Sequence, residues 1–164
     1  MDRLALPDTF INAGKGYLAA LEKLGLRPEG LLWAFDATID GFALVLVTAQ
    51  FDHVGPTAIY KVLTKAYRAS ITPEEINPFF VRLHSVNHAI VLVLKQALDL
   101  GLDAQSMRPD GTMGPAEFIQ IHLDAMDLRF KKEWVYRFAV NRIKPAERSR
   151  RWKRFSENVE RLAA

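Results

Sequence analysis

Basic side chains are concentrated in the last part of the chain, where they could bind an anion. Between Arg142 and Arg161 the 164-residue sequence holds eight Lys and Arg residues against three Glu, whereas the rest of the chain carries a small excess of acids. Clustered positive charge attracts an anionic partner more effectively than the same charge spread evenly. Lys and Arg neutralise phosphates without reading a base sequence, so this segment could bind nucleic acid or an acidic protein surface.

The basic segment has the pattern of an amphipathic helix over residues 145–162. Pro145 suits the first helical position, and apolar residues recur at helical spacing along one side. The candidate anion-binding residues on the opposite side are Arg150, Lys153, Arg154 and Arg161. Glutamates lie four residues from several basic residues, and such pairs can also support a helix face that only meets solvent. Both interpretations stay open.

His122, Asp124 and His84 are the residues that could do acid–base or metal chemistry. His122 and Asp124 share the polar side of an alternating strand with Gln120, and we expect Arg137 across from them on a partner strand. A His beside a carboxylate can act as a general base or a metal ligand. The same alternation is typical of the outer face of any half-buried strand. A small hydrolase, with His84 brought near by folding, is therefore the alternative function.

The sequence lacks the patterns of common catalytic and cofactor sites. It has no Cys, which excludes disulfides, thiol catalysis and Cys-ligated zinc. Gly14-Lys15-Gly16 lacks the spacing of a nucleotide-binding loop, and no GxSxG motif is present. We therefore expect neither a metal nor a cofactor. The sequence favours a non-catalytic binding or regulatory module over an enzyme.

The composition indicates a globular protein of the cytoplasm. Apolar residues make up 49% and charged residues 25% of the chain, and residues 1–164 can form one domain with its own core. The first eight residues include an early acid and a proline instead of the apolar core of a signal peptide. No apolar run approaches the roughly 20 residues that span a bilayer, so we expect no membrane partner. A homo-oligomeric structural subunit is a third possibility, because the first predicted hairpin is apolar on both faces.

The elements that position these residues follow an α+β pattern. A helix is predicted from Asp8 to Gly25, followed by two apolar strands, 31–37 and 42–49, that meet through Asp40-Gly41. Apolar residues at nearly every position of these strands predict that both sheet faces are covered there. Further helices are predicted over 56–70, 72–75 (a single turn) and 87–100, strands over 79–84, 119–125 and 134–140, and a loop over 102–116. The apolar run 89–94 could equally form a buried strand.

The last two predicted strands should pair with each other, and the final helix should follow them. The chain is therefore predicted to fold as an α+β domain, with a mainly antiparallel sheet of four to five strands and helices packed on it. The order of elements also allows a duplication of an αββα unit. Hairpins and helices that alternate without any duplication would explain the same order.

Overall fold

A mixed sheet lies at the centre of the molecule. The computed structural model describes residues 4–100, 105–107, 111, 113–115 and 118–164. Six strands form this sheet in the order β3-β2-β1-β7-β6, with β8 also paired to β1. Their bounds are Gly30–Asp36 (β1), Gly41–Thr48 (β2), Val81–Ser85 (β3), Ile119–Leu123 (β6), Met126–Phe130 (β7) and Val135–Phe138 (β8). A separate pair consists of β4 (Gln105–Met107) and β5 (Met113–Pro115).

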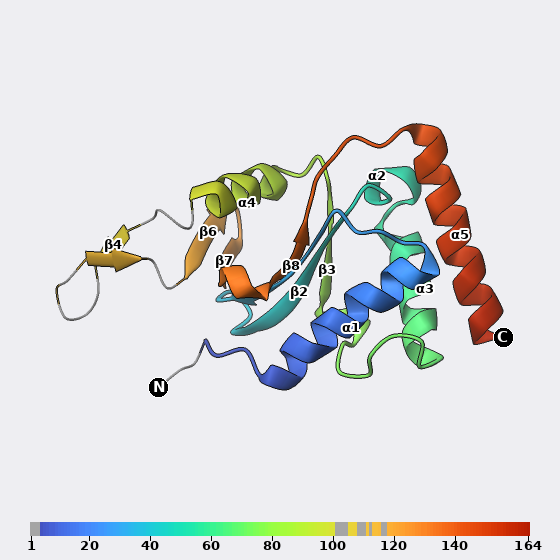
Figure 1. Cartoon of the computed structure of the whole chain (residues 1–164), viewed down its shortest axis with the longest axis horizontal. Coiled ribbons are helices and arrows are strands. Elements are labelled where there is room, and N and C mark those ends of the chain that lie inside the picture. The colour runs from blue at the N-terminus through green and yellow to red at the C-terminus, as the bar shows by residue number, and fades with distance from the viewer. Residues whose placement is uncertain (1–3, 101–104, 108–110, 112, 116–117) are drawn as a thin grey trace.

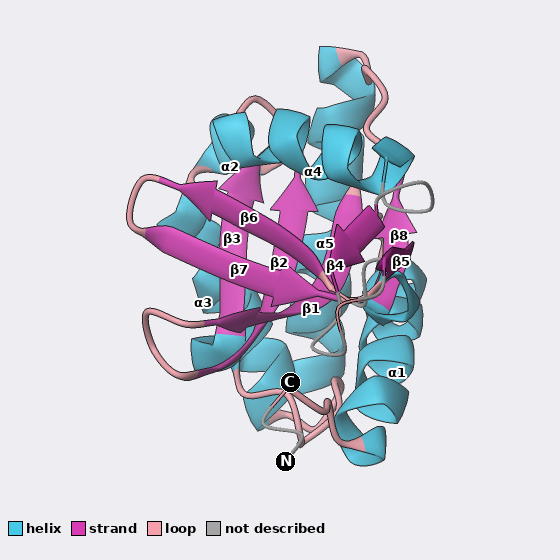
Figure 2. Ribbon diagram, turned by 90° about the vertical axis from the view of Figure 1, so that its left-hand side faces the viewer, coloured by secondary structure: helices cyan, strands magenta, loops and turns pink. Residues whose placement is uncertain are grey.

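Helices cover both sides of the central strands. They are α1 (Asp8–Leu24), α2 (Phe51–Val54), α3 (Pro56–Arg68), α4 (Ala89–Leu100) and α5 (Pro145–Ala163), with short 3₁₀ helices at Pro78–Phe80 (η1) and Lys132–Trp134 (η2). In Figure 1, α1, α3 and α5 lie to the right of the central strands, whereas α4 lies on the other side with β6 and β7. Figure 2 shows that β6 and β7 run across the direction of β2 and β3. The sheet is thus strongly twisted, and β1 and β2 are buried along most of their length.

The α+β class is confirmed, but the sheet is larger and less uniform than predicted. It has six strands instead of four to five among the described residues, and β2 and β3 are parallel. Parallel neighbours need a crossover connection, which the segment containing α2 and α3 supplies. The αββα order does not repeat in the second half, because five strands separate α4 from α5.

The first hairpin and the final helix follow the sequence predictions closely. The register of β1 and β2 runs from Asp36 opposite Gly41 to Gly30 opposite Val47. Asp40, in the turn between them, has a φ of 49°, which Asp tolerates better than most residues. The final helix ends one residue beyond its predicted end, at Ala163. Local turn and capping patterns were therefore sufficient to predict both elements.

The predicted pairing of the two C-terminal strands is wrong. β6 pairs with β7 through a two-residue turn of Asp124 and Ala125, in which Asp124 has a φ of 51°. β8 pairs instead with the first half of β1, where Arg137 lies opposite Leu31. The strand predicted over 119–125 is thus one arm of a local hairpin, and Arg137 is not its neighbour.

Two smaller predictions also differ from the structure. The single turn predicted over 72–75 is present only as an isolated turn, in which the Ile76 N–H donates a hydrogen bond of 3.2 Å to the Pro73 carbonyl oxygen. The chain then forms η1 after the Asn77-Pro78 step, so that β3 begins only at Val81. Asn77 Oδ1 accepts a hydrogen bond from the backbone N–H of Phe79, which fixes this 3₁₀ turn. Most of the loop predicted over 102–116 lies outside the described residues, although β4 and β5 fall within it.

Candidate anion-binding surface

Helix α5 docks on the rest of the molecule through one narrow side. Phe155 and Val159 are buried on this side. Asn158 Nδ2 donates a hydrogen bond of 2.7 Å to the carbonyl oxygen of Leu24, near the C-terminal end of α1. This bond satisfies a carbonyl that has no partner within its own helix. Together these contacts determine which side of α5 faces solvent.

The four predicted anion-binding residues are all exposed, but they do not form one stripe. At about 100° per residue, Arg150, Arg154 and Arg161 fall within about 40° of one another, whereas Lys153 lies about 60° or more away. None of the three arginines lies within ion-pair distance of a carboxylate in the described part of the chain. Lys153 Nζ, in contrast, is 3.9 Å from Glu157 Oε1. Glu157 lies on the same side of α5, within about 60° of all three arginines, so this side presents three guanidinium groups that are unpaired among the described residues and the carboxylate of the Lys153–Glu157 pair.

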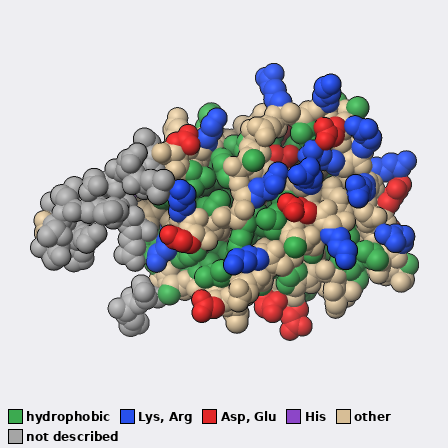
Figure 3. Space-filling model, in the orientation of Figure 1, with side chains coloured by type: hydrophobic (Ala, Val, Ile, Leu, Met, Phe, Trp, Pro, Cys, Tyr) green, Lys and Arg blue, Asp and Glu red, His purple; other side chains and the backbone are tan. Residues whose placement is uncertain are grey.

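Arginines from two other segments extend this positive charge beside α5. Arg27, after α1, and Arg137, on β8, line a pocket of about 230 Å³ together with Arg151 of α5. The side chain of Arg154 packs over Gly25, two residues before Arg27 in the sequence. In Figure 3 many basic side chains gather over the part of the surface where α5 lies. We refer to this group as the basic face: Arg27, Arg137, Arg150, Arg151, Arg154 and Arg161, of which Arg151 lies at the edge beside the pocket, about 60–100° around α5 from the other three arginines of this helix.

Two members of the basic face already have carboxylate partners. Arg151 donates a hydrogen bond of 2.7 Å to Glu147 Oε1, one turn earlier in α5. Arg137 Nη1 lies 3.7 Å from Glu22 Oε1 of α1. The remaining members make no ion pair with another described residue, and they supply the charge available to a partner.

A buried carboxylate lies in the floor of the arginine-lined pocket. Glu29 is 6% exposed, and its Oε2 accepts a hydrogen bond of 2.9 Å from the backbone N–H of Ala49. Burial raises the pKa of Glu29, although the Ala49 hydrogen bond and the charges of Arg151 and Arg137 oppose the shift. Glu29 therefore interacts electrostatically with Arg151 and Arg137 from within the fold.

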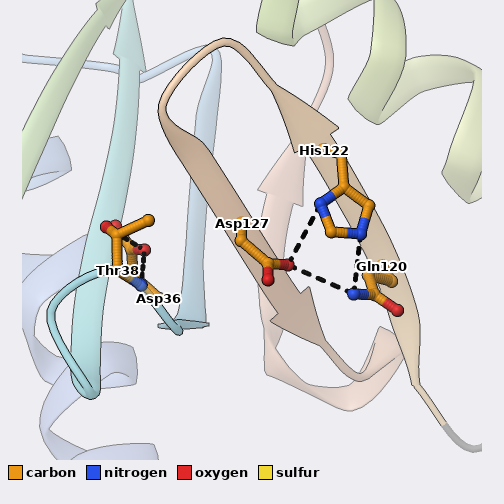
Figure 4. A network of polar contacts seen from close by, with 5 residues as sticks. All are labelled: Asp36, Thr38, Gln120, His122 and Asp127. Carbon is orange, nitrogen blue, oxygen red and sulfur yellow. Dashed lines mark hydrogen bonds and ion pairs between the residues drawn. The ribbon is translucent and has the colours of Figure 1, made fainter.

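His122 lies on the exposed face of the β6–β7 hairpin, next to Asp127 instead of Asp124. His122 Nδ1 is 3.6 Å from Asp127 Oδ1, and Gln120 Nε2 lies 2.9 Å from His122 Nε2 and 3.2 Å from Asp127 Oδ1 (Figure 4). The side chain of His122 is 70% exposed, whereas Asp124 occupies the turn. Water reaches this group freely, unlike the closed sites that favour proton transfer. Catalysis by His122 stays a prediction.

His84 does not join His122. It lies on β3, at the opposite edge of the sheet from β6, and the strand register places it on the other face. Its ring centroid is 4.9 Å from that of His88. Burial, followed by the charges of His88 and Arg82, lowers the pKa of His84 to about 4. The three candidate catalytic residues therefore lie in different places.

The low pKa of His84 predicts that mild acid destabilises the fold. The ring is neutral in the folded protein down to about pH 4, whereas a free His side chain titrates near 6.5. Since the unfolded chain then binds the additional proton, stability is complete above pH 6.5 and falls as the pH decreases toward 4. We expect a loss on the order of 1–2 kcal/mol, because solvent reaches part of the ring.

Urea unfolding followed by circular dichroism, across that pH range, tests this expectation. His84→Asn should remove most of the loss between pH 6.5 and 4 and leave the remaining pH dependence unchanged. Parallel stability profiles of the variant and the wild type would show that another group titrates.

Comparisons with known proteins assign no relative to this chain. No family model matches it, and the searches of curated proteins and of solved structures found no match either. Within the described residues, no helix has the length and apolar character needed to cross a membrane. In the same part of the chain, His, Asp and Glu side chains form no group of three that could hold a metal ion. The candidate site rests on the geometry described above.

Proposed function

We propose that this protein is a binding or regulatory module that holds an anionic partner on its basic face, with nucleic acid as the first candidate. The observation that carries the proposal is that Arg150, Arg154 and Arg161 project from one side of α5 without a carboxylate partner among the described residues. Guanidinium groups bind phosphate oxygens through paired hydrogen bonds, and here they need not first break an ion pair.

The spacing of these arginines suits a phosphate backbone. At 1.5 Å per residue they extend over about 16 Å of α5, the length of about five base steps of a duplex. Contacts of this kind carry no sequence information, so we expect weak, salt-dependent binding with Kd on the order of 10⁻⁴ to 10⁻⁶ M. An acidic protein surface, the second candidate partner, would have to present its carboxylates along the same line.

Fluorescence anisotropy with labelled duplex and single-stranded DNA and RNA, at two salt concentrations, tests the proposal. The triple variant Arg150→Gln, Arg154→Gln, Arg161→Gln should bind duplex at least about tenfold more weakly. Its slope of log Kd against log salt should fall by about 0.9 for each lost contact. Lys153→Gln alone should have a smaller effect, because Lys153 lies on another side of α5 beside Glu157.

A control variant with the same change in net charge separates a local site from general attraction. Lys15, Lys95 and Lys132 are exposed on α1, α4 and η2 and belong to neither α5 nor the basic face, and replacing all three with Gln should leave most of the affinity intact. Equal losses in the two triple variants would contradict a site on α5. Unchanged binding by the arginine variant would mean that α5 presents only a solvated charged side.

A further inference from the structure

Aromatic and basic side chains meet in a second groove, along the exposed side of α3. Tyr60, Tyr67, Arg68 and Phe79 contribute to a groove of about 440 Å³. This groove shares Tyr60 and Arg68 with a larger one of about 780 Å³, which extends to Lys61. Phe79 is 94% exposed, which is unusual for a ring of this size within an ordered turn. The groove shares no residue with the basic face, although its larger part reaches Ala163 at the end of α5.

The exposed position of Phe79 is set by fixed backbone contacts. Its N–H donates a hydrogen bond of 3.0 Å to Asn77 Oδ1, and Pro78, the residue between them, is buried. Tyr60 Oη donates a hydrogen bond of 2.7 Å to the carbonyl oxygen of Val81, just after this turn. These contacts fix the backbone at Phe79, and its exposed ring is available to stack on a planar group.

The charge of the groove selects an anionic occupant. Helix α3 contains no Asp or Glu, and Lys61 and Arg68 are exposed on it. No acidic residue lines either part of the groove among the described residues. Lys65, which also lines it, is already neutralised by Glu160, whose Oε2 lies 2.6 Å from the Lys65 Nζ. Among the described residues Lys61 and Arg68 therefore remain unpaired, and Arg68 lines the same part of the groove as Phe79.

We infer that this groove binds single-stranded nucleic acid, with an unpaired base stacked on Phe79 and backbone phosphates on Lys61 and Arg68. Proteins that hold single strands combine a positive groove with aromatic platforms, because every base has a face that can stack. Bases within a duplex are already stacked on each other and offer no such face. The inference shares with the proposed function the assumption that the partner is nucleic acid, but a different set of residues carries it.

The test compares a labelled oligothymidylate with a labelled duplex by fluorescence anisotropy. Phe79→Ala should weaken binding of the single strand by about tenfold and leave binding of the duplex unchanged. Phe79→Tyr should keep the affinity, since a tyrosine ring stacks equally well. Leu92→Ala is the matched control, because Leu92 is a 66% exposed apolar residue of α4, on the other side of the sheet. Because Phe79 is exposed, we expect each variant to fold like the wild type, and a thermal melt of each one verifies this.

The charged residues have a separate readout. Lys61→Gln and Arg68→Gln should each lower the salt slope of single-strand binding by about 0.7, whereas Lys95→Gln on α4 should not.

Each outcome separates this inference from the proposed function. Two results for Phe79→Ala would overturn the stacking site: an unchanged affinity for the single strand, or an equal loss of affinity for the single strand and the duplex. If Phe79 instead binds an apolar protein partner, the affinity for the single strand would be unchanged. A loss of duplex binding in the arginine variant of α5 would still support the basic face. The reverse pattern, with single-strand binding sensitive to Phe79 and duplex binding insensitive to α5, would overturn the proposed function alone.

Discussion

Replacing Gly14 with Ala should strongly destabilise the protein, although Ala is the better helix former. Gly14 is buried within α1, and a Cβ atom at this position would collide with the ring and hydroxyl of Tyr136. Tyr136 Oη is held there by the hydrogen bond of 2.7 Å that it donates to the carbonyl oxygen of Ile11. The added methyl group must displace the ring and break this bond. We expect a net loss of about 3 kcal/mol, against a gain in helix propensity of about 1 kcal/mol.

Gly16→Ala is the matched control, in the same helix. A Cβ atom there would lie 3.4 Å from Pro73 Cγ, an ordinary contact, and Gly16 is exposed. This variant should therefore be as stable as the wild type or more stable, by up to about 1 kcal/mol. In a Tyr136→Ala background, Gly14→Ala should lose most of its cost, because the colliding ring is absent. Urea and thermal unfolding measure all four variants, and equal stability of Gly14→Ala and Gly16→Ala would contradict the close approach of Tyr136.

Loss of the Asp36 carboxylate is the second large effect that we expect. Asp36 is fully buried at the end of β1, and it accepts hydrogen bonds from the N–H (2.9 Å) and the hydroxyl (2.6 Å) of Thr38. It also forms an ion pair with Arg82 of β3, which spans the intervening strand β2. Burial alone would raise the pKa of Asp36, but the bonds from Thr38 and the guanidinium of Arg82 together hold it below its usual value.

Asp36→Ala should cost about 2–4 kcal/mol, because it leaves the donors of Thr38 and Arg82 without their acceptor. Arg82 is 29% exposed, so the cost should fall below that of a completely buried pair. Asp40→Asn removes the same charge from an exposed turn position in the same hairpin, and should change stability by less than about 0.5 kcal/mol. Urea unfolding distinguishes the two. Similar midpoints for both variants would show that the ion pair does not stabilise the sheet.

The parts of the fold with local signals could be predicted from the sequence. Asp40-Gly41 between two apolar runs defined the first hairpin, because a tight turn sets the register of its strands. Pro145 and the spacing of Phe155 and Val159 likewise defined α5 and its buried side. In these cases the residues that determine the element lie within the element itself.

Contacts between distant segments could not be predicted in this way. Met126, Leu128 and Phe130 alternate with polar residues, but no strand was predicted over this short segment. Its pairing with β6 and β1 is not visible in any local pattern. The missed strand shifted the expected partner of β6, and with it the position of Arg137.

The same distinction between local signals and distant contacts applies to the candidate sites. The arginines of α5 were predicted, since they belong to one helix. Arg27 and Arg137 were not predicted for this site, because the packing of α5 on the end of α1 and the pairing of β8 with β1 bring them beside α5. Phe79 was assigned to a strand, since the sequence alone does not show that Asn77 fixes a 3₁₀ turn at that position.

The central position of β1 has a consequence for how the chain is made. Among the described strands β1 is synthesised first, and β2 follows directly to cover one of its edges. In the part of the chain that the structure describes, its other edge pairs with β7 and β8, which lie about 90 residues or more further along the sequence. During synthesis β1 therefore has unpaired backbone N–H and C=O groups along one edge until β7 and β8 are made. Such an edge can pair with a strand of a second chain. Completion of the sheet by β7 and β8 closes this route to aggregation, so the protein depends on its C-terminal third for safe folding as well as for its basic surface.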